Sequence, residues 1–169
     1  QTTARLPWLL IGMIGGIGNS LILGNFDSTF AAHPEMALYI PLIGGTGGNV
    51  GTQSSAIVVQ GLANSSLDAK NTFKQVTKEA VVALINATII SLLVYTYNFI
   101  RFGATATVTY SVSISLFAVV MFASIFGTLV PMTLEKLKID PAIATGPFIA
   151  ITNDIIGMML YMGITVLLS

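Results

Sequence analysis

The sequence contains no cysteine, a single histidine and very few charged residues. Without cysteine the chain has no disulfide framework, no thiolate metal site and no thiol nucleophile. Its net charge is zero, so no basic surface indicates nucleic acid as a partner. Charged residues make up only 8% of the 169 residues, whereas soluble domains contain about 25%. A chain with so little charge is expected to be embedded in lipid.

Apolar residues take up much of the remaining sequence. They account for 54% of the chain, and the mean hydropathy is +0.84. A helix needs about 20 residues to cross a hydrocarbon core about 30 Å thick. Five stretches meet this requirement, so we predict an all-α membrane protein whose residues 1–169 form one transmembrane helical bundle. The predicted helices cover residues 6–23, 37–62, 76–100, 107–130 and 148–168.

Basic residues are distributed unequally between the two sides that five crossings would create. Six of the seven basic residues flank the predicted helices on one side, and Arg101 is the exception. Those six are Arg5, Lys70, Lys74, Lys78, Lys136 and Lys138. Cytoplasmic flanks of membrane proteins are enriched in Lys and Arg. We therefore predict a cytoplasmic amino terminus and a carboxyl terminus on the outside.

Asp154 is the only charged residue in the last apolar stretch. A carboxylate at membrane depth costs roughly 2.5–3.5 kcal/mol on insertion scales, so it is tolerated only where it faces protein, water or a cation. On a helical wheel it shares a stripe with Gly146, Ala150, Gly157 and Tyr161. Small residues around an acid predict a groove with the negatively charged carboxylate at its base. The alternative is a carboxylate that bonds neighbouring hydroxyls or is protonated by burial.

The second apolar stretch is interrupted by glycine. Its middle contains Gly44, Gly45, Gly47, Gly48 and Gly51, and each costs a helix about 1 kcal/mol relative to alanine. Either the glycines let another backbone come close, or they permit an unwound stretch that lines a watery cavity. Asn49 and Gln53 favour the second interpretation, because their spacing puts both amides on one face with Gly45. We predict that Gly45, Gly48, Gln53 and, from the last stretch, Gly157 line a pore and that Asn49 contacts its ion.

The chemistry of these groups predicts a cation as the ligand. A carboxylate, carboxamides and backbone carbonyls are hard oxygen donors, which suit Mg²⁺, Ca²⁺ or Mn²⁺ rather than Zn²⁺ or Cu⁺. Mg²⁺ usually keeps several waters, so one carboxylate per chain would hold a hydrated ion. Five helices with a single acid are too few to enclose a pathway. We therefore infer a two-fold homodimer with a shared pore, in which two Asp154 side chains face one ion.

Two other classes of membrane protein remain open from the residues alone. In a proton- or sodium-coupled cation carrier, Asp154 would be a titrating relay and access would alternate between the two sides. In a structural anchor, the polar residues would only hold helices together. An enzyme is not expected, because the sequence offers no Ser/His pair, no H-E-x-x-H pattern and no second buried acid. His33 lies in a predicted outer loop and is assigned no catalytic role.

Three runs of the sequence resemble the membrane domain of the MgtE family of bacterial magnesium channels. They are RLPWLL at residues 5–10, PLIGGTGGNVGTQSSAIVVQGLA at residues 41–63 and KIDPAIATGPFIAITND at residues 138–154. The resemblance covers essentially the whole chain. It implies a homodimeric, Mg²⁺-selective channel of the bacterial inner membrane that imports divalent cations, with Mn²⁺ and Co²⁺ as further candidates. It also implies a pore at the dimer axis, lined mainly by the second and fifth predicted helices.

The same resemblance implies roles for individual residues. Asp154 stands at the position of the family's selectivity acid, and the carbonyl of Ala150 is expected to face the hydrated ion. Gly146 occupies a position where the family can have Asn, so no side-chain contact to the ion is expected there. Asp140 matches an acid near the cytoplasmic mouth that is part of a magnesium-dependent gate.

Full-length members of that family carry further domains. An amino-terminal helical domain and paired CBS domains sense cytoplasmic Mg²⁺ and close the pore through a connecting helix. We expect these regulatory domains, which are partners of the pore in the full-length protein, to lie outside the present 169 residues. Because a sensor shifts a gating equilibrium only through its own contacts, this chain is expected to form the pore without most of that regulation. Membrane lipids are its other expected partners.

Overall fold

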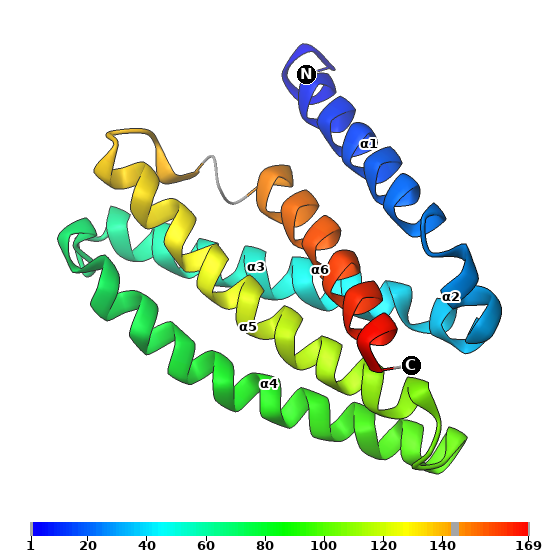
Figure 1. The fold of residues 1–169 in the computed structure, drawn as a ribbon. Coiled ribbons are helices and arrows are strands. Elements are labelled where there is room, and N and C mark those ends of the chain that lie inside the picture. The colour runs from blue at the N-terminus through cyan, green and yellow to red at the C-terminus, as the bar shows by residue number, and fades with distance from the viewer. Residues whose placement is uncertain (1, 143–145, 169) are drawn as a thin grey trace.

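The computed structural model describes residues 2–142 and 146–168, and within them every regular element is a helix (Figure 1). Residues 143–145, which belong to the run that connects Asp140 to Asp154, lie outside the described residues. The long helices are α1 (Thr2–Gly24), α3 (Ile40–Ala63), α4 (Thr72–Phe102), α5 (Thr107–Lys136) and α6 (Pro147–Leu168). Short helices α2 (Asp27–Ala32), η1 (Pro34–Tyr39) and η2 (Ala69–Asn71) complete the described chain. The prediction of an all-α fold is confirmed, and each predicted stretch coincides with a long helix.

Four of the long helices in the described chain are both long and apolar enough to cross a membrane. These are α1, α4, α5 and α6. Helix α3 has 24 residues, but its five central glycines and its three carboxamides make it less apolar than the others. The chain is thus a multi-pass membrane protein. The fifth crossing, the orientation and the homodimer stay predictions.

Helix α5 is the central helix of the bundle. It packs against α3, α4 and α6, and α6 also packs against α3. Figure 1 shows α4 and α5 running side by side, with α3 and α6 on the other side of α5. Fifteen of the α5 residues are buried, whereas α1 has no buried residue and packs mainly on α6. Helix α1 is therefore exposed to its surroundings over most of its surface.

The glycines of α3 allow close packing against α5. A Cβ atom added to Gly127 of α5 would lie 2.6 Å from the backbone oxygen of Gly51. One added to Gly47 would lie 2.9 Å from Cγ1 of Val119. Helix α3 is also unbroken from Ile40 to Ala63. The interpretation that these glycines permit an unwound stretch is therefore wrong, because α3 stays helical through all of them and the backbone of α5 packs directly against Gly51.

One end of the bundle is closed by a buried cluster that ties η1 to the long helices. The cluster includes Met36, Tyr39, Ile43, Leu116 and Tyr161. The hydroxyl of Tyr161 donates a hydrogen bond of 2.8 Å to the carbonyl oxygen of Met36. The hydroxyl of Tyr39 donates to Oδ1 of Asn98, which is fully buried in α4. These two bonds join residues that are far apart in sequence and hold η1 against α4 and α6.

Replacing Tyr161 by phenylalanine should lower the melting temperature of the purified protein. The substitution removes one buried hydrogen bond, which contributes about 0.5–1.5 kcal/mol, and in a chain of this size each kcal/mol shifts the melting temperature by about 2–4 °C. Gel filtration after heating in detergent measures the change. Tyr95→Phe is the control, because the Tyr95 side chain is 37% exposed and its ring packs on Phe99. Equal melting temperatures for both variants would contradict the assignment.

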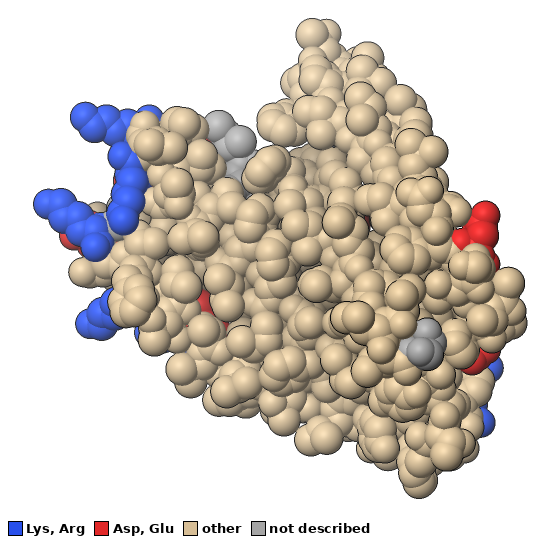
Figure 2. Space-filling model, in the orientation of Figure 1, with Lys and Arg blue, Asp and Glu red and all other residues tan. Residues whose placement is uncertain are grey.

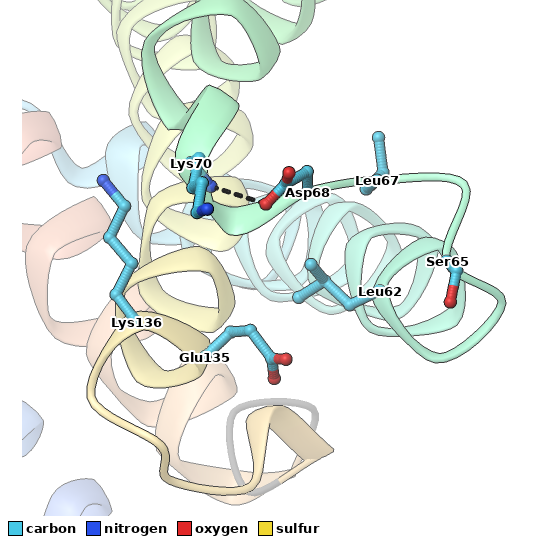
Figure 3. Close-up of a pocket in the computed structure, with 7 residues that line it drawn as sticks. All are labelled: Leu62, Ser65, Leu67, Asp68, Lys70, Glu135 and Lys136. Atoms are coloured by element: carbon cyan, nitrogen blue, oxygen red, sulfur yellow. Dashed lines mark hydrogen bonds between the residues drawn. The ribbon is translucent and has the colours of Figure 1, made fainter.

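Most charged residues lie near the ends of the bundle, and Glu79 and Asp154 are exceptions within the long helices. Figure 2 shows a concentration of Lys and Arg at the end where α3 and α4 are connected and α5 terminates. Figure 3 shows part of this end, where Asp68, Lys70, Glu135 and Lys136 surround a cavity of about 530 Å³. The carboxylate of Asp68 accepts a hydrogen bond of 3.0 Å from the backbone amide of Lys70, which lies in η2. This arrangement is typical of a solvated helix end, and it agrees with the predicted cytoplasmic side.

Candidate functional site

Asp154 projects from α6 toward the glycine-rich face of α3. Its Oδ1 atom lies 3.5 Å from the position that a Cβ atom of Gly48 would occupy, and 3.7 Å from that of Gly44. The side chain is half-buried. Among residues 2–142 and 146–168, no group donates a hydrogen bond to the carboxylate and no cation pairs with it. The alternative in which neighbouring hydroxyls bond this acid is therefore not what the structure shows.

A small cavity connects Asp154 to α1. It has a volume of about 80 Å³ and is lined by Gly12, Gly15, Gly16, Asn19, Ile151 and Asp154. Gly15 touches Ile151 so closely that a Cβ atom there would overlap the isoleucine side chain. Oδ1 of Asn19 is buried and has no hydrogen-bond partner within the described chain. Helix α1 thus brings a polar oxygen to the acid through its glycine face.

Asn19 is absent from the residues predicted from sequence, although a signal for it exists. Glycines at 12, 15 and 16 and the asparagine at 19 recur at intervals of three and four residues, which places them on one face of a helix. This small-residue spacing is typical of tightly packed membrane helices and does not by itself indicate a site. Its relation to Asp154 depends on how α1 and α6 meet, which the sequence does not reveal.

Asn153 is a second polar residue that was not predicted. It is 1% exposed, and neither its Oδ1 nor its Nδ2 has a hydrogen-bond partner in the described chain. Its amide occupies space that a Cβ atom on Gly51 would fill, and its backbone oxygen lies near Gly47. Asn153 therefore points into the contact of α6 with α3 at Gly51, whereas Asp154 lies beside Gly44 and Gly48 of α3 and also lines the cavity next to α1.

The remaining residues predicted on α3 lie on an exposed face of that helix. Gly45, Asn49 and Gln53 are all exposed, and no heavy atom of another segment lies within 4 Å of a Cβ atom built on Gly45. Gly48 differs from them because it lies beside Asp154. A single chain therefore brings Gly48 to the acid but leaves the two carboxamides uncovered.

The predicted stripe on α6 is divided between two environments. Gly146, Ala150 and Asp154 are half-buried, and no heavy atom lies within 4 Å of a Cβ atom built on Gly146. Gly157, by contrast, is buried against Val119 and Ile43. Tyr161, the last residue of the stripe, is also buried. Gly157 was predicted to line a pore. Within one chain it lies instead in the contact of α6 with α3 and α5.

Asp140 lies outside the helices, before the start of α6. Its side chain is exposed, and its Oδ1 accepts a hydrogen bond of 3.0 Å from the backbone amide of Ala142. In sequence it follows Lys136 and Lys138, which places it at the lysine-bearing end of the bundle. The described residues contain no group of three or more His, Cys, Asp or Glu side chains that could hold a metal. Within the described residues, neither Asp140 nor Asp154 therefore belongs to a cluster of three or more such side chains.

Comparison with known proteins gives a consistent result over nearly the whole chain. Residues 40–164 match the MgtE family, which is described as a divalent cation transporter. The magnesium transporter MgtE of Bacillus subtilis is 33% identical over 160 residues, which cover 95% of this chain and 35% of that protein. The protein of the same name from Thermus thermophilus is 32% identical over 165 residues, covering 98% and 36%. That from Enterococcus faecalis is 29% identical over 160 residues. The chain spans about a third of the length of the curated relatives it matches.

Proposed function

Because this chain belongs to the MgtE family of divalent cation transporters, we propose that it forms the pore of a magnesium channel. In this proposal two copies assemble about a two-fold axis in the bacterial inner membrane. Each copy crosses the membrane five times, with its amino terminus in the cytoplasm. Mg²⁺, and with it Mn²⁺ and Co²⁺, enters along the axis, and the protein has no enzymatic activity.

The observation that carries the proposal is the unpartnered carboxylate of Asp154. It lies half-buried within a helix that is apolar enough to cross the membrane, and no group in the described chain neutralises it. A charge at that depth is tolerated when it faces water or a cation. The glycines at 44 and 48 place no side chain between the carboxylate and the backbone of α3. A hydrated divalent cation provides the charge and the hydrogen bonds that the protein does not.

The exposed face of α3 supports the dimer. Gly45, Asn49 and Gln53 lie uncovered on a helix that is buried on its opposite side. A two-fold axis beside this face would bring the same residues of both copies together and would cover them. It would also bring two Asp154 side chains to one ion, whose double charge cancels their mutual repulsion. Ala150 and Gly146 lie one and two turns before the acid and would offer backbone carbonyls to the hydrated ion.

The same dimer accounts for the composition of α3. A helix of 24 residues is about 36 Å long at 1.5 Å per residue, which is enough to cross a hydrocarbon core of about 30 Å. A helix that lines a watery pore on one side does not need to be apolar all round. The glycines and carboxamides that make α3 less apolar are therefore compatible with a fifth crossing.

Asp140 is proposed to act at the cytoplasmic mouth rather than in the pore. Its exposed position at the lysine-bearing end would leave it accessible to the regulatory domains of the full-length protein. We propose that Mg²⁺ held between Asp140 and those domains favours the closed state. The chain alone would lack this bias, because the contacts that distinguish the two states would be missing.

Magnesium flux through the purified chain should follow the electrochemical gradient of Mg²⁺ alone. With the chain in liposomes, the Mg²⁺ current should reverse at the Nernst potential of Mg²⁺, and the reversal potential should not change with a pH or sodium gradient. A proton- or sodium-coupled carrier would shift that potential when its coupling ion is varied, so a shift would favour this alternative. Liposomes that contain the Asp154→Ala variant provide the background.

A further inference from the structure

A second polar groove lies between α3 and α4, away from Asp154. It has a volume of about 330 Å³, and α5 forms its floor. Its polar lining consists of Gln53 and Ser54 from α3, Glu79 and Asn86 from α4, and Ser124 from α5. Glu79 was not predicted as a buried acid, and its half-buried position corrects the expectation that Asp154 has no counterpart. Of the residues that line this groove, only Gln53 has been given a role above.

The polar groups of the groove have no partners within the described part of the chain. Ser54 is 7% exposed and Ser124 is 4% exposed, and neither hydroxyl takes part in a hydrogen bond there. The carboxylate of Glu79 has no ion pair or hydrogen bond with a described residue. Polar groups buried beside apolar side chains at this depth are costly unless something satisfies them. The polar side chains of the groove therefore need water or a ligand to satisfy them.

The groove begins near the lysine-bearing end and reaches toward the middle of the bundle. Glu79 and Asn86 are seven residues apart on α4, so they lie on one face and about 10 Å apart along the axis. Glu79 is the residue nearer to the start of α4, where Lys74 and Lys78 also lie. Lys78 lines a different cavity, beyond the start of the groove. Water and ions from that end would meet the carboxylate first and the carboxamide afterwards.

All the polar groups are oxygen donors of the kind that hard cations prefer. They comprise one carboxylate, two carboxamide oxygens and two hydroxyls, and cysteine is absent from the whole sequence. Mg²⁺ is usually bound through one or two carboxylates while it keeps several waters. The volume is far larger than a bare ion and is sufficient for an ion with its waters. The donor set and the space thus fit one hydrated divalent cation.

We propose that the groove between α3 and α4 binds a hydrated divalent cation, with Glu79 as its charged ligand and Gln53 and Asn86 as neutral oxygen donors. Ser54 and Ser124 bind the waters of the ion from below. This site goes beyond the proposed pore. Its charged ligand Glu79 lies on α4, away from Asp154, and all the groups named come from one chain. Gln53 is the one residue that it shares with the α3 face assigned above to the dimer axis.

The test uses Mn²⁺ as a spectroscopic probe on the 169-residue chain in nanodiscs of uncharged lipid. Asp154→Asn removes the pore acid, so that Mn²⁺ binding measured by electron paramagnetic resonance reports on the remaining sites. We expect one bound Mn²⁺ per chain in this variant, displaced by Mg²⁺. Adding Glu79→Gln should weaken this binding by at least about tenfold, because the only charged ligand is lost. The matched control is Glu135→Gln, which removes an exposed acid at the end of α5 and should leave the binding unchanged.

A gain of affinity provides a second and independent readout. Asn86→Asp adds a carboxylate to the groove and should tighten Mn²⁺ binding by about tenfold, as a second charged ligand does in other sites. This variant keeps the result interpretable if Glu79→Gln fails to fold. Unchanged Mn²⁺ affinity in both groove variants would overturn the proposal. Loss of transport in a chain that still binds Mn²⁺ through Glu79 would count against the proposed pore and not against this site.

Discussion

Asp154→Ala should reduce magnesium flux to that of protein-free liposomes. At about 5 Å from a divalent ion, a carboxylate contributes roughly 6 kcal/mol of attraction at an effective dielectric constant of 20. In the proposed two-fold pore this contribution would be lost twice. A magnesium-sensitive dye inside the liposomes measures the flux. Growth rescue of a strain that lacks magnesium transport, at equal expression, gives the same comparison in cells, and Asp154→Asn is the conservative variant for it.

The control for this prediction is Asp27→Asn. Asp27 begins the short helix α2, is exposed and lies outside the long helices, so its substitution should leave the flux unchanged. Loss of flux in Asp154→Ala with a normal gel-filtration profile would separate a conducting role from a structural one. If Asp154→Asn rescues growth as well as the unmodified chain, the acid has no role in selecting the ion. Unchanged flux in Asp154→Ala would favour the structural anchor.

Gly127→Ala should destabilise the bundle, because it places a methyl group against the backbone of α3. The added Cβ atom would lie 2.6 Å from the carbonyl oxygen of Gly51 and 3.2 Å from its Cα atom. A clash with backbone atoms is not relieved by a side-chain rotation, so α3 and α5 must move apart. Overpacking of this kind costs about 1–3 kcal/mol. At about 2–4 °C per kcal/mol, the melting temperature should fall by several degrees.

Gly163→Ala is the matched control for the glycine contact. Gly163 also lies inside a long helix, but no heavy atom of another segment lies within 4 Å of its added Cβ atom. The substitution should therefore leave the melting temperature unchanged or raise it, because alanine favours a helix over glycine by about 1 kcal/mol. If both variants melt at the same temperature, the close contact between α3 and α5 does not contribute to stability as described.

The positions of the long helices could be predicted from the sequence, because the lengths of its apolar stretches determine them. The role of the glycines in α3 could not, because it depends on Gly127, which lies 76 residues after Gly51 in sequence and touches its backbone. A stretch of glycines is compatible with both close packing and unwinding. Only the partner helix distinguishes the two, and nothing in residues 41–63 identifies that partner.

The candidate site was predicted in part for a related reason. Asp154 is conspicuous as the one charge in an apolar stretch, so composition alone identifies it. Gly157 shares its helical face but is buried, because a face on a wheel does not show where a neighbouring helix begins to cover it. Asn19 and Glu79 were not identified, since each lies on a different helix from Asp154. Their surroundings depend on helix packing that the periodicity does not encode.

The contrast between α1 and α5 has a consequence for how the protein is made. Helix α1 has no buried residue, so it does not depend on a later helix to cover its side chains when the translocon releases it. Helix α5 contains buried hydroxyls such as Ser111, Ser115 and Thr128, and its glycine contact with α3 forms only when both helices are present. Synthesis at about 5–20 residues per second separates the end of α3 from the end of α5 by roughly 4–15 s. In the proposed topology of five crossings, α3 with its glycines and carboxamides would need shielding from lipid during that interval, by the insertion machinery or a chaperone.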